Sequence, residues 1–385
     1  MNAPLDLGAN VVATAARHAD DVDRKGRFPA EAIQALKDAR FLSLSIPIEF
    51  GGGGASLSDV AEICTSLGQQ CASTAMIFAM HQIKVSSLVA HGRGSAWHEE
   101  FMRRVCDEQL LLGSATTEGG VGGNMRNSIC AFQRDGAIFR IAKEGALISY
   151  GAYSDAILVT ARRASDSPPS DQQMAVLEKS QYELERTGSW DALGMRGTCS
   201  EGFTFSGQAP VEQIFTHDFA EIASQSMLAT AHLLWSAVWF GVASDALARA
   251  QSFVRKDARR RPDGPAPGAL RLAEAANKLQ LMRVNIVEGL KRFARAQQNE
   301  DDLNSMNFAV AMNNVKIGSS QLSIEIINHA LLIAGIAGYK NDTPFSVGRH
   351  MRDALSAQVM ISNDRIFTNL SNLLLAQRID QRLGD

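Results

Sequence analysis

Residues 190–200 read Trp-Asp-Ala-Leu-Gly-Met-Arg-Gly-Thr-Cys-Ser. We expect the run Gly-Met-Arg-Gly-Thr to bend the chain at a sheet edge, with Trp190 packed against the bend. This stretch lies near the end of a region, from about 111 to 215, in which short apolar or alternating segments are separated by Gly, Asp, Ser and Pro. Such punctuation is typical of strands and turns. The expected strands are 128–133, 138–142, 156–162, 174–177 and 202–206.

Helical periodicity dominates on both sides of this region. Before it, the clearest helical segments are 56–68 and 73–91. After it, periodic runs cover 219–256, 268–297, 303–335, 344–356 and 358–380. The order predicts an α+β chain. Its parts are an N-terminal α-helical domain (1–110), a middle β-barrel-like domain (111–217) and a C-terminal helical bundle (218–385).

Composition narrows the class of protein. The 385 residues carry a formal net charge of -3, which argues against nucleic acid as a partner because phosphate binding needs clustered excess Lys and Arg. Five cysteines without CxxC spacing indicate reduced thiols in a cytoplasmic protein and no metal site. The start, MNAPLDLGAN, lacks the features of a signal peptide. The apolar segment 227–246 contains His232 and Asp245, so we expect a buried helix and no membrane association.

Four more segments carry distinctive residues. Residues 115–124 read Ala-Thr-Thr-Glu-Gly-Gly-Val-Gly-Gly-Asn, and 147–151 read Leu-Ile-Ser-Tyr-Gly. Residues 333–339 read Ile-Ala-Gly-Ile-Ala-Gly-Tyr, and 351–354 read Met-Arg-Asp-Ala. Together with 190–200, their order and spacing resemble the acyl-CoA dehydrogenase superfamily over nearly the whole chain. The resemblance implies that superfamily's fold, FAD as the cofactor and an oxidoreductase activity.

The resemblance also implies which residues contact FAD. Thr116, Thr117, Gly122 and Gly123 belong to a Gly-rich loop whose backbone can approach phosphate closely. On the next strand, Ser149 stands where the superfamily uses a threonine hydroxyl at the flavin N5 edge. Its neighbours there are Leu147, in place of a common tryptophan, and Ile148. Read without the resemblance, the first segment is a Gly-rich turn and the second is ordinary core packing.

Further flavin contacts are implied toward the C-terminus. Ile333, Gly335 and Ile336 correspond to a segment that contacts the FAD of a neighbouring subunit, which implies a homodimer or homotetramer. Arg255 is expected to pair with the pyrophosphate, although a solvated basic loop at 255–261 is an equal alternative. Asn363 completes the implied set.

The superfamily's catalytic glutamate is missing. In most members it follows the Asp of the Arg-Asp-Ala motif by eight residues, a position held here by Ile361. In a minority it lies on an earlier helix, close to Ala231. The nearby replacements are Asp364 and His232, because a carboxylate or an imidazole can accept a proton. The alternatives are a helix cap or surface pair for Asp364 and a core histidine for His232.

Three functions follow from these observations. The leading hypothesis is an FAD-dependent α,β-dehydrogenation of an acyl thioester, on CoA or on an acyl carrier protein, with electrons passed to a protein partner or to oxygen. The second is a flavin-dependent monooxygenase or oxidase on the same fold. The third is a degenerate, non-catalytic flavoprotein subunit.

Overall fold

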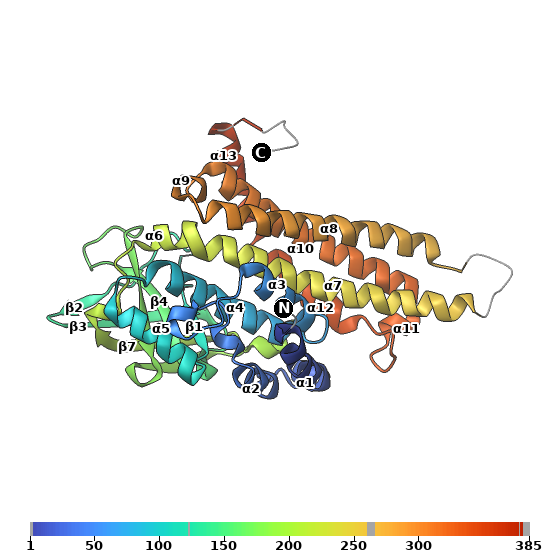
Figure 1. The fold of residues 1–385 in the computed structure, drawn as a ribbon, viewed down its shortest axis with the longest axis horizontal. Helices are drawn as coiled ribbons and strands as arrows, with labels where there is room; N and C mark the ends of the chain where they lie inside the picture. Colours follow the sequence, from blue (N-terminus) through green and yellow to red (C-terminus); the bar gives the residue numbers. More distant parts are fainter. Residues whose placement is uncertain (1–2, 122–123, 260–265, 377, 380–385) are drawn as a thin grey trace.

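The computed structural model describes residues 3–121, 124–259, 266–376 and 378–379. Figure 1 shows the strands gathered at one end and the long helices α7, α8 and α10 running to the other. The helices are α1 (Ala3–Lys25), α2 (Ala30–Asp38), α3 (Leu57–Gly68), α4 (Ala72–His91), α5 (Ala96–Glu108), α6 (Phe219–Ile222), α7 (Leu228–Ala258), α8 (Ala269–Ala296), α9 (Glu300–Leu303), α10 (Met306–Ala334), α11 (Ile336–Tyr339), α12 (Gly348–Val359) and α13 (Asn363–Ala376). The strands are β1 (Leu112–Ala115), β2 (Gln133–Asp135), β3 (Ile138–Ile148), β4 (Ala156–Arg162), β5 (Gln172–Glu178), β6 (Tyr182–Gly188) and β7 (Glu201–Pro210).

The strands form two sheets. The first sheet has the order β1-β4-β5, with β1 parallel and β5 antiparallel to β4. The second sheet, β2-β3-β7-β6, is antiparallel throughout. Strand β4 is buried on both faces: Ile157 and Val159 share a core with Phe139 and Phe205 of the second sheet. Leu158 instead packs in the core that α4 and α5 supply.

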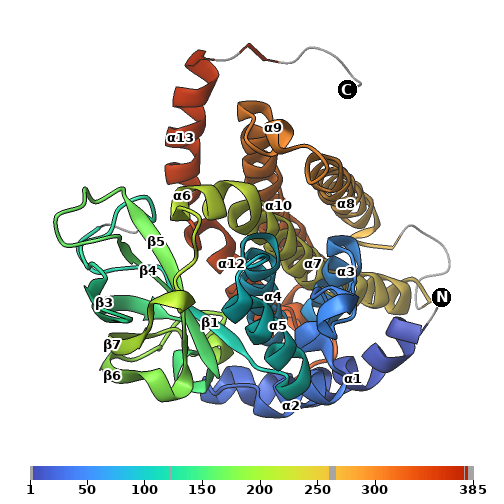
Figure 2. The ribbon, with the colours of Figure 1, turned by 60° about the vertical axis from the view of Figure 1, so that its left-hand side comes forward.

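The helices confirm the predicted α+β architecture. Figure 2 shows α4 between the sheets and the C-terminal helices, so this helix links the two regions. Helices α7, α8 and α10 share one large core with the N-terminal helices. Among the described residues, one helical segment, Phe219–Ala258, is long and apolar enough to cross a membrane, and 89% of its apolar window is buried inside the protein.

Two details of the β region differ from the sequence prediction. The expected strand at 128–133 is wrong: the amides of Ile129 and Cys130 donate to the carboxylate of Glu118 instead of to a neighbouring strand. Strands β1 and β6 were not predicted. Strand β6, Tyr-Glu-Leu-Glu-Arg-Thr-Gly, is a mostly exposed edge strand, so its sequence lacks the apolar pattern of a buried one.

The stretch 190–200 makes the expected bend and joins all three parts of the chain. Met195 has a left-handed φ of 52° and precedes a short 3₁₀ turn, Arg196–Thr198. The Trp190 indole donates to the Met195 carbonyl at 3.1 Å. The Met195 amide donates to Asp353 Oδ1 of α12 at 2.7 Å, and the Gly197 amide donates to Ser73 Oγ of α4 at 3.1 Å. This bend therefore ties the β region to the helices on both sides.

Candidate active site

The site region begins where α4 meets β1. The Leu112 amide donates to Nδ1 of His81 at 3.0 Å, so the ring proton lies on Nε2, which donates to the Leu42 carbonyl at 2.6 Å. Burial lowers the pKa of His81 to about 4, which keeps the ring neutral. The Tyr150 hydroxyl donates to the Leu112 carbonyl at 2.9 Å. These bonds hold β1 in place beside α4.

A small cavity of about 10 Å³ lies at this junction, enough for one water molecule. Helix α4 contributes Lys84 and Ser87 to its wall, and Ser114 and Thr116 come from β1 and the residue after it. The rest of the wall is apolar and is formed by Ile83, Leu158, Met174 and Met227. Thr116 is one of the predicted flavin contacts, so the cavity adjoins the predicted cofactor position.

A chain of three hydroxyls lies at the end of β3. Thr198 Oγ1 donates to the Met195 carbonyl at 2.9 Å and lies 2.8 Å from Ser200 Oγ. Because the Thr198 proton is used, Ser200 donates to Thr198 and accepts from Ser149, whose Oγ is 2.8 Å away. Ser149 therefore offers lone pairs outward and suits a ligand N–H group.

The neighbouring predicted flavin contacts divide between surface and core. The Leu147 side chain is 48% exposed, and the Thr117 hydroxyl donates to the Leu147 carbonyl at 2.9 Å. The exposed Leu147 side chain lies next in sequence but one to Ser149, whose hydroxyl has free lone pairs. An apolar surface of this kind suits the face of an aromatic ring. The Ile148 side chain, in contrast, is fully buried between the sheets. Gly122 and Gly123 lie outside the described residues.

Four of the remaining predicted flavin contacts, Arg255, Ile333, Gly335 and Ile336, lie toward the ends of α7 and α10. Arg255, Gly335 and Ile336 are exposed where α7 and α10 end, remote from the strands (Figure 1). Gly335 has a φ of 54° and open space around it. The Ile333 side chain is buried and packs near Gly268. Figure 1 places the ends of α7 and α10 away from the strands, so this group and the group around Ser149 lie in different parts of the protomer.

Ile361, at the position predicted for the superfamily's catalytic glutamate, has polar groups of another kind around it. Lys316, fully buried on α10, donates to the Ile361 carbonyl and to Asn363 Oδ1, both at 2.6 Å. The Asn363 amide also donates to Ser320 Oγ at 3.0 Å, so this side chain is engaged inside the protein. Burial lowers the pKa of Lys316 to about 8. The group beside the Ile361 backbone is therefore the amino group of Lys316. The neighbours named here include no carboxylate.

The two predicted bases lie in different surroundings. Asp364 is exposed in the first turn of α13, where a negative charge favours the helix dipole. His232 is buried on α7; its Nδ1 lies 3.2 Å from the Met312 carbonyl, and its Nε2 has no partner among the described residues. Burial, followed by the nearby Lys316, lowers the pKa of His232 to about 4. The imidazole is therefore neutral near pH 7.

Glu118 organises the loop after β1. Its carboxylate accepts from Ser128 Oγ at 2.8 Å and from the amides of Ile129 and Cys130 at 3.0 and 2.7 Å. Burial alone would raise the pKa of Glu118, but these hydrogen bonds and the Lys143 ammonium outweigh it and lower the pKa. The loop that carries the glycines is therefore fastened by a buried, ionised side chain.

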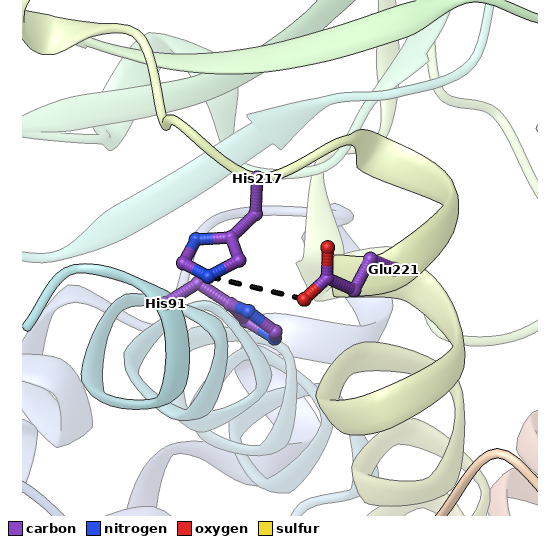
Figure 3. Close-up of side chains that lie close together, drawn as sticks. All are labelled: His91, His217 and Glu221. Carbon is purple, nitrogen blue, oxygen red and sulfur yellow. Dashed lines mark ion pairs between the residues drawn. The ribbon is translucent and has the colours of Figure 1, made fainter. Parts of the chain in front are cut away.

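Sequence reasoning missed two polar features. One is Lys84, whose signal was a single lysine in the mostly apolar segment 73–91. The other is the group of His91, His217 and Glu221, in which the imidazoles and the carboxylate lie within 4.8 Å of one another (Figure 3). Ligand atoms on one zinc ion are about 3.3 Å apart, given bonds of about 2.0–2.1 Å. These side chains would have to move closer together to hold a metal ion.

Comparison with known proteins agrees with this geometry. Residues 9–109 match the family model of the acyl-CoA dehydrogenase N-terminal domain. Cyclohex-1-ene-1-carbonyl-CoA dehydrogenase from Geobacter metallireducens is 25% identical over 354 residues, 90% of each chain. The 3-sulfinopropanoyl-CoA desulfinase of Paraburkholderia xenovorans is 24% identical over 384 residues, 95% of this chain and 93% of that protein. The FMN-bound structure of TdsC from Paenibacillus sp. A11-2, a dibenzothiophene monooxygenase, has a TM-score of 0.85 at 21% identity over 98% of each chain.

The fold and these relatives support a flavin-dependent oxidoreductase. The match of residues 9–109 and the similarity to acyl-CoA dehydrogenases over most of the chain support the acyl-CoA dehydrogenase superfamily.

Proposed function

We propose that this chain uses FAD to dehydrogenate an acyl thioester between its α and β carbons. The observation that carries the proposal is the cavity between α4 and β1. Thr116 lines this cavity and is also one of the predicted flavin contacts. The relatives that match 90% or more of the chain include two proteins named for acyl-CoA substrates. When bound, the flavin supplies the hydride acceptor. CoA and an acyl carrier protein both remain candidates for the handle.

The protein's own residues have separate tasks in this reaction. Ser149, held by the Ser200–Thr198 chain, positions the ring edge. Of the two predicted bases, His232 is the better candidate, since its Nε2 is buried and unpartnered among the described residues, while Asp364 is exposed. Burial, and after it the nearby Lys316, opposes protonation of His232, which makes it a weaker base than an exposed histidine.

A flavin-dependent monooxygenase is the second candidate, and the observation that favours it is Ile361. The side chain of this residue has no ionisable group. Its backbone carbonyl accepts a hydrogen bond from the Lys316 amino group. A monooxygenase needs no base at this position because it removes no α-proton. TdsC shows that this fold accommodates such an enzyme.

The separation of the two groups of flavin residues supports a homodimer or homotetramer. We infer that a second copy brings its Arg255, Gly335 and Ile336 to a flavin held at Ser149, because these residues lie where α7 and α10 end, away from the strands. The C-terminal helices also expose large apolar side chains, as expected of a surface that another subunit covers. They include Leu281, Val284, Val287, Leu332, Ile336, Tyr339, Phe367 and Leu375. The free cysteines fit the proposed cytoplasmic location.

Anaerobic absorbance of the flavin-loaded protein tests the proposal. Bleaching of the oxidised flavin band on addition of an acyl-CoA would establish dehydrogenation, and loss of bleaching in His232→Gln but not in Asp364→Asn would identify the base. A flavin that no acyl-CoA or acyl carrier protein thioester bleaches would overturn the proposal. Oxygen consumption with supplied reduced flavin would then support the monooxygenase, and inactivity in both assays would support a non-catalytic subunit.

A further inference from the structure

Lys84 is a buried lysine without a partner. It lies on α4, is only 7% exposed and lines the cavity at the α4–β1 junction. The centroid of the Tyr150 ring is 6.0 Å from Nζ. Among the described residues (3–121, 124–259, 266–376 and 378–379), Nζ makes no hydrogen bond and no ion pair. Its amino group therefore has unused capacity for three hydrogen bonds.

Two other buried lysines show how unusual this is. Lys143 donates to the carbonyl and hydroxyl of Thr160, at 2.7 and 3.2 Å. Lys316 donates to a carbonyl and to an amide oxygen, both at 2.6 Å. In both cases the protein supplies acceptors, as buried amino groups require. At Lys84 it supplies none, although leaving such a group unpaired in the interior costs stability.

The cavity wall shows what is missing. Apart from Lys84, it consists of neutral side chains: three hydroxyls (Ser87, Ser114, Thr116) and four apolar groups. Burial lowers the pKa of Lys84 to about 7, because no negative charge offsets the loss of water. The nearby His81 is neutral and has both ring nitrogens occupied. A ligand that brings a full negative charge would restore the ammonium form, which a neutral carbonyl does far less effectively.

The cavity can also widen. Met174 and Met227 form part of its wall, and unbranched thioether side chains change rotamer readily. Thr116 connects the same wall to the predicted flavin position. A group bound at Lys84 would therefore lie beside the predicted flavin position.

We propose that Lys84 recognises an oxyanion, a carboxylate or a sulfur oxyanion, carried by the acyl part of the substrate. The substrate class is then acyl thioesters with an acidic chain end, in place of plain fatty acyl chains. This inference rests on the proposed thioester function, and it assigns Lys84 a role in specificity.

Calorimetric titration of the flavin-loaded protein with matched thioesters tests it. Succinyl-CoA and 4-methylpentanoyl-CoA have ends of similar shape, but only the first is charged; 3-sulfopropanoyl-CoA distinguishes a sulfur oxyanion from a carboxylate. We expect at least about a tenfold preference for one of the acidic thioesters over the neutral one, equivalent to about 1.4 kcal/mol. Lys84→Met, which keeps the side-chain length, should abolish the preference, and Lys84→Arg should retain it. Lys291→Met, at an exposed lysine on α8 outside the cavity, is the control and should leave the ratio unchanged.

The possible failures are distinguishable. Equal binding of acidic and neutral thioesters by the parent protein, or an unchanged ratio in Lys84→Met, overturns the role of Lys84 and leaves the thioester function standing. A loss of flavin content in Lys84→Met with no change in the ratio would assign the lysine to the cofactor and also overturn the inference. If no thioester binds, but free succinate or propane-1-sulfonate binds in a Lys84-dependent way, the anion site stands and the thioester function fails.

Discussion

A methyl group at position 194 would strike the backbone of α12. A Cβ on Gly194 would lie 2.1 Å from the Arg352 carbonyl oxygen, 2.3 Å from its carbon and 2.7 Å from the Asp353 nitrogen. Ordinary contact begins at 3.4 Å, so the two segments would have to separate by the difference, roughly 1.3 Å. Because the obstructing atoms are helix backbone, they cannot swing aside as a side chain can. The same movement would stretch the 2.7 Å bond from the Met195 amide to Asp353.

The expected cost of Gly194→Ala follows from these contacts. Overpacking of a tight site costs about 1–3 kcal/mol. Loss of a hydrogen bond to a charged group costs about 1.5–3 kcal/mol. Alanine also lowers the conformational entropy of the unfolded chain, which stabilises the folded protein by about 0.4–1 kcal/mol and offsets part of this cost. We expect the free energy of unfolding to fall by about 1.5–5.5 kcal/mol.

Urea denaturation followed by circular dichroism measures this change. The matched control is Gly188→Ala in β6, where the nearest atom to the added Cβ is 3.8 Å away and no large change is expected. Flavin content is a second readout, since the bend leads into the Thr198–Ser200–Ser149 hydroxyl chain. Equal urea midpoints for the two variants would refute the packing argument.

The other predictions concern charge and the proposed base. Glu118→Gln should destabilise the protein by about 1.5–3 kcal/mol through loss of a charged acceptor, and an unchanged urea midpoint would contradict the role given to its carboxylate. Burial raises the pKa of Asp353 to about 6, so between about pH 4 and 6 the folded chain holds a proton that the unfolded chain has released. Its contribution to stability therefore falls as pH rises through this window, and Asp353→Asn should remove that slope from urea midpoints measured against pH. If His232 is only a core histidine, His232→Gln will lower stability and leave flavin reduction intact. Sedimentation of the parent protein should show a dimer or tetramer; a stable flavin-loaded monomer would refute the shared site.

Much of the fold could be read from local pattern. The strand at 156–162 was predicted to the residue because it is a short apolar run between polar turns. The helices at 56–68, 73–91 and 268–297 lie within one residue of the predicted bounds, because their periodicity and their ends are local features. The bend at 190–200 was also predicted, since glycine spacing constrains the backbone wherever the segment packs.

Some elements could not be read in this way. Residues 128–133 look apolar enough for a strand, yet the amides of Ile129 and Cys130 donate to Glu118, a partner that only the folded loop provides. Strand β6 is polar because it lies at an edge, and edge position is a property of the sheet.

The sequence by itself determined the class of architecture, and it predicted the superfamily and the replacement of the usual glutamate by Ile361. Only the tertiary structure showed that Lys316 donates to the Ile361 carbonyl, that the predicted flavin residues form separate groups, and that Lys84 is buried without a hydrogen bond among the described residues. The physical reason is that helices and strands follow from interactions within a few residues. The charge state and the partners of a buried side chain, in contrast, depend on atoms that folding brings together from distant parts of the chain.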